Sequence, residues 1–223
     1  MSKLTKRLKT IADFVTKDAL VLDVGADHGY LSIYLVEYGV AKGCVATDIN
    51  EAPLMSAQKN IAMHSLSERI KTKLTDGLEG VDLGGITDIV IAGMGGILIS
   101  EILEKRHPLD GKNLVLQPMT QAAHLRKWLC ENGYEILSEA PSFANDKWYC
   151  IINARYDGEK RECDELFSLV GKMPDSAYPE RKEYLKHIEE KLQKKIEGLK
   201  KAQNVTDELQ KSLDLVDKLR FKM

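Results

Sequence analysis

Short apolar runs alternate with amphipathic stretches from residue 19 to residue 154, and no other feature of the sequence limits its possible folds as strongly. A short apolar run bounded by turn residues predicts a buried strand, whereas apolar residues at every third or fourth position predict a helix. The predicted strands are 19–24, 43–48, 70–74, 88–92 and 113–117. The predicted helices are 30–38, 52–61, 97–103 and 123–132. This alternation is typical of an α/β domain with a mostly parallel, doubly wound sheet.

The elements on either side of this alternation follow other patterns. Residues 134–140 and 148–154 read as two strands joined only by a loop, which predicts an antiparallel hairpin at the edge of the sheet. At the start of the chain, apolar residues recur at helical spacing from 4 to 15. Lys6, Arg7 and Lys9 lie elsewhere around the turn, so this segment predicts an amphipathic helix with a basic face.

The strand signal ends after Tyr156. Residues 180–201 place apolar side chains along one helical stripe, and a second stripe follows Thr206, a predicted helix N-cap. Because neither helix buries its stripe alone, we expect an antiparallel hairpin, joined through 203–205, that packs on itself or on the first domain. The predicted domains are therefore 1–156, an α/β domain, and 157–223, a helical accessory domain.

The charge, the cysteines and the lack of long apolar runs narrow the class of protein. A net charge of −2 gives no sign of a polyanionic partner, so any basic surface must be local. No apolar run approaches the roughly 18 residues that span a bilayer, and the first residues lack a signal-peptide core, so we expect a cytoplasmic protein without membrane contact. The cysteines and histidines show no metal-ligand spacing, and no metal is expected.

The buried strand at 19–24 leads into the most informative motif of the chain. Gly25 and Gly29 allow the backbone of this turn to approach a ligand, but a dinucleotide site would also need glycines at positions 27 and 30. The carboxylate of Asp27 would repel a diphosphate, whereas it suits a ligand with sulfonium and ammonium groups. An ordinary strand–helix turn is the alternative interpretation. The candidate ligand contacts in this motif are Asp23, Gly25, Asp27, His28 and Gly29.

Two more acids end the second and third strands. Asp48 lies 19 residues beyond Gly29, a position from which a carboxylate accepts hydrogen bonds from both ribose hydroxyls of an adenosyl cofactor. Asp76, followed by Gly77, can accept from the adenine amino group, although an Asp-Gly turn explains the pair almost as well. Because the carboxyl ends of parallel strands share one edge of the sheet, we expect all of these acids at one ligand-binding edge.

The fourth strand ends in Gly93-Met94-Gly95-Gly96, at the centre of that edge. Three glycines in four residues leave open backbone beside the expected methyl group, so a planar substrate base can lie against this segment with Met94 packed on it. A tight crossover into the next helix is the alternative explanation. Gln117, which ends the fifth strand, places an amide where it can hydrogen-bond the edge of a base.

Together these motifs resemble the bacterial tRNA (adenine-N1)-methyltransferases that modify adenine 22. The resemblance covers essentially the whole chain, including the basic opening 4–8 and the helical tail. The family pattern has Asn after Gln-Pro, where this chain has Met119, so no polar substrate role is expected at position 119. The Asn/Asp-Pro-Pro-aromatic motif of many amino-directed methyltransferases is absent, which fits a ring nitrogen as the methyl acceptor. The matching segments are Asp23–Leu31 (DVGADHGYL), Asp76–Leu78 (DGL), Gly93–Gly96 (GMGG), Gln117–Pro118 and Leu125–Leu129 (LRKWL).

The resemblance implies a Rossmann-like class I methyltransferase domain with a seven-stranded, mostly parallel sheet over 1–156, and a coiled-coil-like domain over 157–223 that helps to hold tRNA. It implies S-adenosylmethionine as cofactor, tRNA as partner and N1 of adenine 22 as the methylated atom. The target base must then leave its stack, and positioning dominates, because N1 already has an in-plane lone pair. Expected cofactor contacts are Asp23, Gly25, Asp27, His28, Gly29, Asp48, Asp76, Gly77 and Gly93. The expected substrate pocket, with Asp27 as an electrostatic helper for the cationic product, is Asp27, Gly93, Met94, Gly95 and Gln117.

Two other functions remain open at this point. A methyltransferase for a small molecule or a protein would use the tail as a lid or a dimerisation element, and a survey of modified nucleosides separates it from a tRNA enzyme. A noncatalytic RNA- or protein-binding module with a vestigial cofactor fold would not need intact Asp23, Gly25, Asp48 and Asp76, and a cofactor titration tests it. The sequence leaves the oligomeric state undetermined, with a monomer favoured.

Overall fold

A computed structural model describes residues 4–201 and 207–223. The predicted N-cap at Thr206 and the predicted connection at 203–205 lie outside the described residues.

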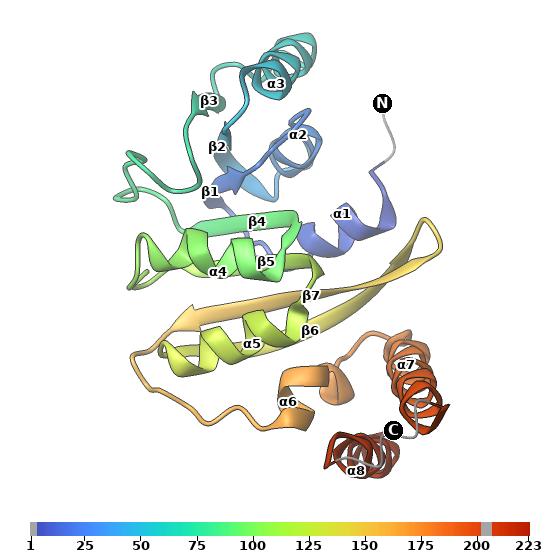
Figure 1. The fold of residues 1–223 in the computed structure, drawn as a ribbon. Helices are drawn as coiled ribbons and strands as arrows, with labels where there is room; N and C mark the ends of the chain where they lie inside the picture. Colours follow the sequence, from blue (N-terminus) through green and yellow to red (C-terminus); the bar gives the residue numbers. More distant parts are fainter. Residues whose placement is uncertain (1–3, 202–206) are drawn as a thin grey trace.

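Seven strands form one sheet in the order β3-β2-β1-β4-β5-β7-β6 (Figure 1). Adjacent strands from β3 to β5 pair in parallel, whereas β7 pairs antiparallel with both β5 and β6. The mostly parallel sheet with an antiparallel hairpin edge is therefore confirmed. The strands are β1 Ala19–Val24, β2 Ala41–Asp48, β3 Ile70–Leu74, β4 Asp88–Gly95, β5 Asn113–Thr120, β6 Tyr134–Ala144 and β7 Lys147–Tyr156.

Helices cover both faces of this sheet, because alternate residues of the central strands point to opposite sides. On one face, Val21, Val90 and Val115 pack in the hydrophobic cluster that includes residues of the first three helices. On the other face, Leu22 and Ile89 pack in the cluster that includes residues of the next two helices. The first set is α1 Lys6–Ala12, α2 Tyr30–Glu37 and α3 Glu51–Met63, and the second is α4 Gly96–Glu104 and α5 Ala122–Glu131.

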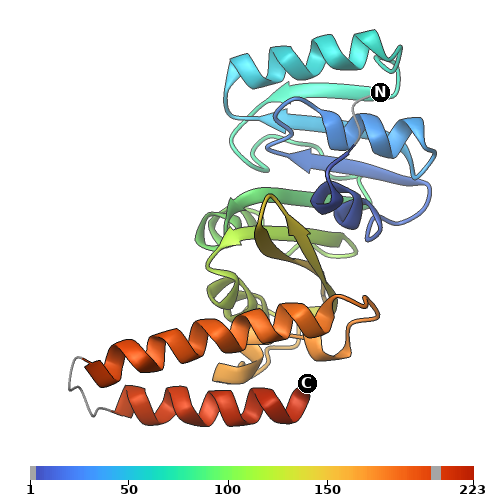
Figure 2. The same ribbon diagram turned by 90° about the vertical axis from the view of Figure 1, so that its right-hand side faces the viewer.

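The rest of the chain is helical and packs beneath α5, with its two long helices side by side (Figure 2). Tyr184, Ile188 and Leu219 of these helices belong to the same hydrophobic cluster as the α4–α5 face, so the hairpin closes both on itself and on the first part of the chain. The elements are α6 Glu165–Val170, a 3-10 turn at Met173–Asp175, α7 Arg181–Lys201 and α8 Asp207–Lys222. None of the helices within the described residues has the length and apolarity needed to cross a membrane.

Helix α1 joins the sheet to the start of this helical region. The Nζ atom of Lys6 lies 2.5 Å from Oε1 of Glu180. Just after α1, the rings of Phe14 and Tyr178 stack with centroids 6.2 Å apart, and the Tyr178 hydroxyl donates to Oδ2 of Asp13 at 3.2 Å. These contacts hold α1 and the residues just after it against the segment that precedes α7.

Candidate cofactor-binding site

Two cavities lie side by side at the carboxyl ends of β1, β2 and β4. The Asp48 cavity, of about 280 Å³, has Asp48 and Asp76 in its wall, and the Asp23 cavity, of about 230 Å³, has Asp23 and Asp27. Neither volume reaches the roughly 300 Å³ at which small-molecule sites begin, whereas the two together do. The residues that line both cavities, and so join them, are Gly25, Ala92 and Gly93.

The two carboxylates of the Asp48 cavity differ in their exposure and in their hydrogen-bond partners. Asp48 is largely buried, and its Oδ1 accepts from the backbone N–H of Asn50 at 2.9 Å. Among the described residues its Oδ2 has no hydrogen-bond donor, so this oxygen is available to a ligand hydroxyl. Asp76 is more exposed, and its Oδ2 accepts from Nζ of Lys105 at 2.6 Å. Lys105 also donates to Glu79 at 2.9 Å, so one lysine holds two acids at the rim.

Asp23 is the buried acid of the second cavity. Its Oδ2 accepts from the Ser32 hydroxyl at 2.7 Å. Burial raises the pKa of Asp23 from 3.8 to about 6, with the Ser32 hydrogen bonds opposing the shift. A buried carboxylate at neutral pH lacks full solvation, so a ligand cation in this cavity would find a partner there.

We expect Asp23→Asn to stabilise the protein in the absence of any ligand. Because the pKa is higher in the folded state, the stability contributed by Asp23 is fully present below about pH 4 and is lost as the pH rises through about 6. The variant should therefore exceed the parent in free energy of unfolding by roughly 1–3 kcal/mol at pH 8 and by almost nothing at pH 4. Denaturant titrations of both proteins across this range measure the difference, and a constant offset would contradict the assignment.

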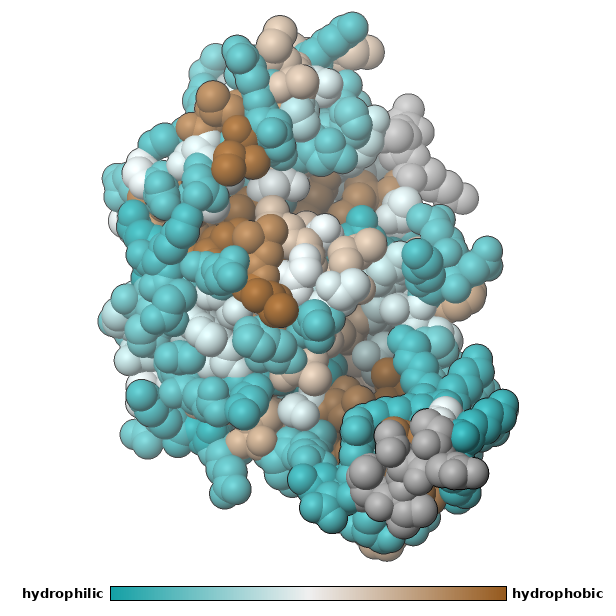
Figure 3. Space-filling model, viewed as in Figure 1, coloured by the Kyte–Doolittle hydropathy of each residue, from teal (hydrophilic) through white to brown (hydrophobic). Residues whose placement is uncertain are grey.

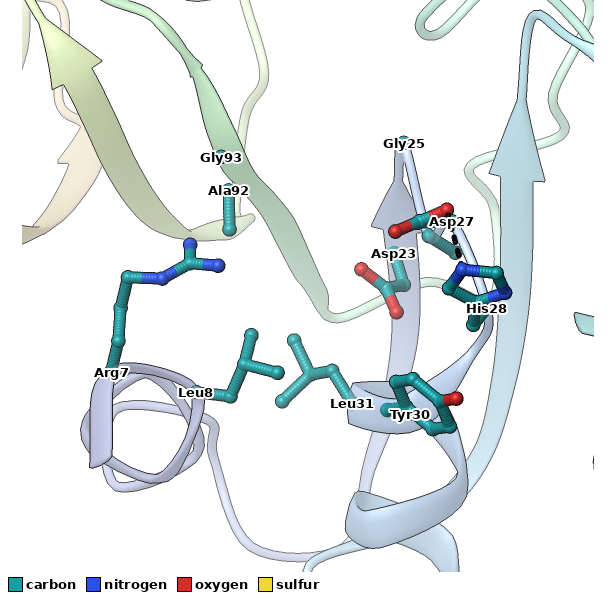
Figure 4. Close-up of a pocket in the computed structure, with 11 residues that line it drawn as sticks. Arg7, Leu8, Asp23, Gly25, Asp27, His28, Tyr30, Leu31, Ala92 and Gly93 are labelled. Atoms are coloured by element: carbon teal, nitrogen blue, oxygen red, sulfur yellow. Dashed lines mark ion pairs between the residues drawn. The ribbon is translucent and has the colours of Figure 1, made fainter. Parts of the chain in front are cut away.

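The turn after β1 lies between the two cavities. Gly25 has φ +71°, and a Cβ at this position would overlap Cε of Met94, so Met94 packs across Gly25. Asp27 and His28 form an exposed pair, with Nε2 of His28 3.6 Å from Oδ1 of Asp27. Figure 4 shows both side chains beside Asp23, on the wall of the Asp23 cavity that faces Arg7.

Gln117 lies behind the glycine-rich rim and is fully buried. Its Oε1 accepts from the N–H of Gly93 at 3.2 Å and from Nη1 of Arg7, and its Nε2 donates to the carbonyl of Pro118 at 2.9 Å. Its amide is therefore occupied within the protein and holds Gly93 and Arg7 in place.

The three cations of α1 lie in different environments. Lys6 pairs with Glu180, Arg7 points into the cavity and Lys9 is exposed.

The last two glycines of the rim differ in what surrounds them. A Cβ at Gly96 would overlap the backbone carbonyl of Gln121, so close approach of two backbones requires glycine here. At Gly95 a Cβ would meet only Oγ1 of Thr120, at an ordinary 3.5 Å. The crossover into α4 thus explains why glycine is needed at position 96 but not why it is present at position 95.

Beside this rim, Figure 3 shows apolar surface over α4, where Ile97 and Leu98 are 44% and 47% exposed.

The structure brings most of the predicted site residues together. Gly29, Gly95 and Gln117 line neither cavity. Within the described residues no group of three His, Cys, Asp or Glu side chains is arranged to hold a metal ion. Predicted residues that line the cavities are Asp23, Gly25, Asp27, His28, Asp48, Asp76, Gly77, Gly93 and Met94. Lining residues that the sequence did not indicate include Arg7, Leu8, Leu31, Asn50, Leu98 and Ile102.

A seven-stranded sheet in this order, with acids at the ends of three successive strands around a two-part cavity, defines the class as S-adenosylmethionine-dependent methyltransferases. Residues 4–152 match the model of a family described as methyltransferase domain. The chain is 33% identical to the tRNA (adenine(22)-N(1))-methyltransferase of Bacillus subtilis (strain 168) over 98% of this chain and 95% of that protein. The chain therefore belongs to the tRNA (adenine(22)-N(1))-methyltransferase family.

Two solved structures of similar proteins contain the cofactor or its product. A Streptococcus pneumoniae protein in complex with S-adenosyl-L-methionine has a TM-score of 0.81 and 32% identity, covering 99% of both chains. M. capricolum TrmK in complex with S-adenosyl-homocysteine has a TM-score of 0.78 and 27% identity, covering 97% of this chain and 96% of that chain. The similarity to both structures includes the helical tail.

Proposed function

We propose that this chain is a cytoplasmic enzyme that uses S-adenosylmethionine to methylate N1 of adenine 22 in tRNA. The observation that carries the proposal is the two-part cavity with acids at three strand ends, in a chain that matches the Bacillus subtilis enzyme over nearly its full length. No feature of the site favours a small-molecule or protein substrate, or a noncatalytic module.

The residues present fit the cofactor. The free Oδ2 of Asp48 suits ribose hydroxyls, Asp76 suits the adenine amino group, and the buried Asp23 suits a cation. When bound, the cofactor supplies a methyl group activated by a positively charged sulfur. Met94, Ile97 and Leu98 offer apolar surface at the rim for a planar base. No side chain needs to remove a proton from neutral adenine N1, so the chain acts mainly by positioning, with Asp27 proposed to favour the cationic product.

Nucleoside analysis after methylation in vitro tests this function. The purified full-length protein is incubated with S-adenosylmethionine and an unmodified tRNA transcript, and the digested nucleosides are separated and identified by mass spectrometry. We expect N1-methyladenosine, and none from a transcript in which adenine 22 is replaced by guanine. Another methylated nucleoside, or equal product from both transcripts, would contradict the proposal.

Asp48→Ala should weaken binding of S-adenosylmethionine by about 1.5–3 kcal/mol, because charge-assisted hydrogen bonds to ribose are lost. Isothermal calorimetry on the full chain measures the change. Glu51→Ala, an exposed acid in the first turn of α3, removes a charge close by and serves as the control. Equal affinity of Asp48→Ala and the parent would remove Asp48 from the site.

Gly95→Val and Gly96→Ala should separate catalysis from folding. A Cβ at Gly95 makes only an ordinary contact, so Gly95→Val should keep the fold and most cofactor affinity while obstructing the base and lowering turnover. Gly96→Ala must displace the Gln121 backbone and should cost roughly 1–3 kcal/mol of stability. Turnover, cofactor affinity and melting temperature are measured for both. A Gly95→Val protein that loses all three together would show that Gly95 serves only the crossover.

A further inference from the structure

The hairpin of β6 and β7 extends beyond the central sheet. The ladder between β5 and β7 ends at Ile152, whereas the ladder between β6 and β7 continues to Ala144 and Lys147. Figures 1 and 2 show this extension projecting from the sheet, and the hairpin contacts both α1 and α7. Its last residues, 143–148, form the hairpin tip. The tip therefore lies where the helix beside the Asp23 cavity and the first long helix of the tail come together.

The backbone and the packing of the hairpin fix the position of its tip. The two-residue turn, Asn145-Asp146, has φ +50° and +56°, a conformation whose twist matches that of the paired strands. Just before the tip, the ring of Tyr149 has its centroid 5.7 Å from the guanidinium carbon of Arg7, within the range of a cation–π contact. Because Arg7 lines the Asp23 cavity, this contact connects the hairpin to the cavity wall.

Three aromatic rings form a row on the opposite face of the hairpin, since neighbouring residues of a strand point to opposite faces. Phe143 and Trp148 are cross-strand partners with ring centroids 5.0 Å apart, and Trp148 meets Tyr184 of α7 edge-on at 5.9 Å. Tyr184 is buried and Trp148 is half-buried, whereas Phe143 is 42% exposed. The row therefore starts in the core and ends at the surface with a large ring that its neighbours hold in place.

A single exposed aromatic ring is common on protein surfaces, so its surroundings decide what it can bind. Besides the Lys6–Glu180 pair, exposed cations outnumber exposed acids on α1, the hairpin tip and the first two turns of α7. These residues are Lys9, Lys147, Lys182 and Lys186 against Asp146 and Glu183. A fixed aromatic ring among cations matches an unpaired nucleic-acid base, because the ring stacks on the base while the cations contact neighbouring phosphates.

We propose that Phe143 stacks on an unpaired base of the bound tRNA and thereby positions the tRNA between the cofactor cavities and α7. This inference rests on the proposed function, because it concerns the substrate of the same site. Phe143 lines neither cavity, so the base that it holds is a different one from the base that is methylated. Phe143 is therefore a positioning residue, and its loss should raise KM for tRNA with little change in kcat or in cofactor affinity.

Filter binding of an unmodified transcript to the full chain measures the contribution of the ring. Phe143→Ala should weaken tRNA binding roughly 10- to 100-fold, the effect of losing one stack between a base and an aromatic ring. Phe143→Leu is apolar but cannot stack and should lose nearly as much, whereas Phe143→Trp should retain most of the affinity. Tyr38→Ala is the matched control, because it removes a ring that is 57% exposed at the end of α2.

Tryptophan fluorescence locates the contact. The chain has two tryptophans, so Trp128→Phe leaves Trp148, the neighbour of Phe143, as the only one. Titration of this variant with tRNA should quench its emission, and adding Phe143→Ala should move the quenching to roughly 10- to 100-fold higher tRNA concentration. Calorimetry with S-adenosylmethionine should give the same affinity for every Phe143 variant.

Parental tRNA affinity in Phe143→Ala or in Phe143→Leu would overturn the inference, as would an equal loss in Tyr38→Ala. A Phe143→Ala protein with parental tRNA affinity but a changed oligomeric state in sedimentation would assign the ring to a protein contact and would also overturn it. Failure of the parent protein to methylate adenine 22 would instead refute the proposed function, and the binding measurements would still decide the role of Phe143.

Discussion

Replacing Arg126 by methionine should lower the free energy of unfolding by about 3–5 kcal/mol, because it leaves Glu139 charged and unpaired in the protein interior. The two side chains are fully buried and form two hydrogen bonds, of 2.8 Å and 2.9 Å. Nη1 of Arg126 also donates to the carbonyls of Ser168 and Leu169 at 3.0 Å and 2.8 Å, at the end of α6. For a chain of this size the melting temperature should fall by roughly 6–20 °C in calorimetry.

The double variant Arg126→Met/Glu139→Leu separates an unpaired charge from lost packing. It leaves no buried charge and should recover much of the stability lost in the single variant. Lys127→Met, at the exposed neighbouring position, should change stability by less than about 0.5 kcal/mol. A double variant no more stable than Arg126→Met would show that the contacts to α6, not the ion pair, carry the effect.

Charge reversal of Lys186, Lys191 and Lys194 should weaken tRNA binding by roughly 100-fold at 0.1 M salt, because phosphate contacts supply most sequence-independent affinity. All three are exposed on α7, which begins beside α1, and the visible surface of α7 and α8 is mainly hydrophilic (Figure 3). The pKa of His187, on the same helix, is lowered first by burial, and the nearby Lys191 adds to this shift while Glu190 opposes it.

Filter binding of an unmodified transcript at several salt concentrations measures both the affinity and its salt dependence. The slope of log affinity against log salt should become shallower by about 3, one for each lost contact. The same change at Lys42, Lys59 and Lys71, exposed lysines of β2, α3 and β3 at the far end of the sheet, is the matched control. Equal losses in both triple variants would mean that total charge, not the surface of α7, governs binding.

The sequence predicted the architecture wherever a local pattern decides the structure. The apolar run at 19–24 and the acids that end the first three strands correctly predicted which edge of the sheet carries the cavities. The strand predicted at 70–74 is present although it contains only two apolar residues, because β3 is an edge strand in which only Ile70 is buried. A partly exposed edge strand needs few apolar residues, so the apolar run that predicts a strand is short and interrupted by polar residues.

Features that depend on distant packing were not predictable. Arg7 occupies a solvent-facing position in the helical pattern, and only the docking of α1 against β6 and β7 turns it toward Gln117. For the same reason Gln117, expected to present its amide to a base, lies buried with its polar atoms occupied. Whether any of the predicted pocket residues touches the substrate stays a prediction.

The short helix α6 was missed although a local signal for it exists. Asp164 caps it by accepting from the N–H of Phe167 at 2.6 Å, and Leu166, Phe167 and Val170 follow at helical spacing. A six-residue helix has too few turns to show a clear periodicity in the sequence. Its position is fixed by the buried Arg126, which donates hydrogen bonds to the carbonyls of Ser168 and Leu169.

A single hydrophobic cluster extends from Leu22 of β1 to Leu219 of α8. A change in the apolar stripe of the tail therefore also alters the packing beneath the sheet that carries the cofactor site. For this reason the sequence of the tail cannot diverge as freely as that of a separate domain joined only by a linker. We infer that natural variants should show compensating substitutions between the facing sides of α5 and α6 and of β6 and α7. Grafting the tail of a relative onto this chain should succeed only when the facing residues of α5 and β6 are transferred with it.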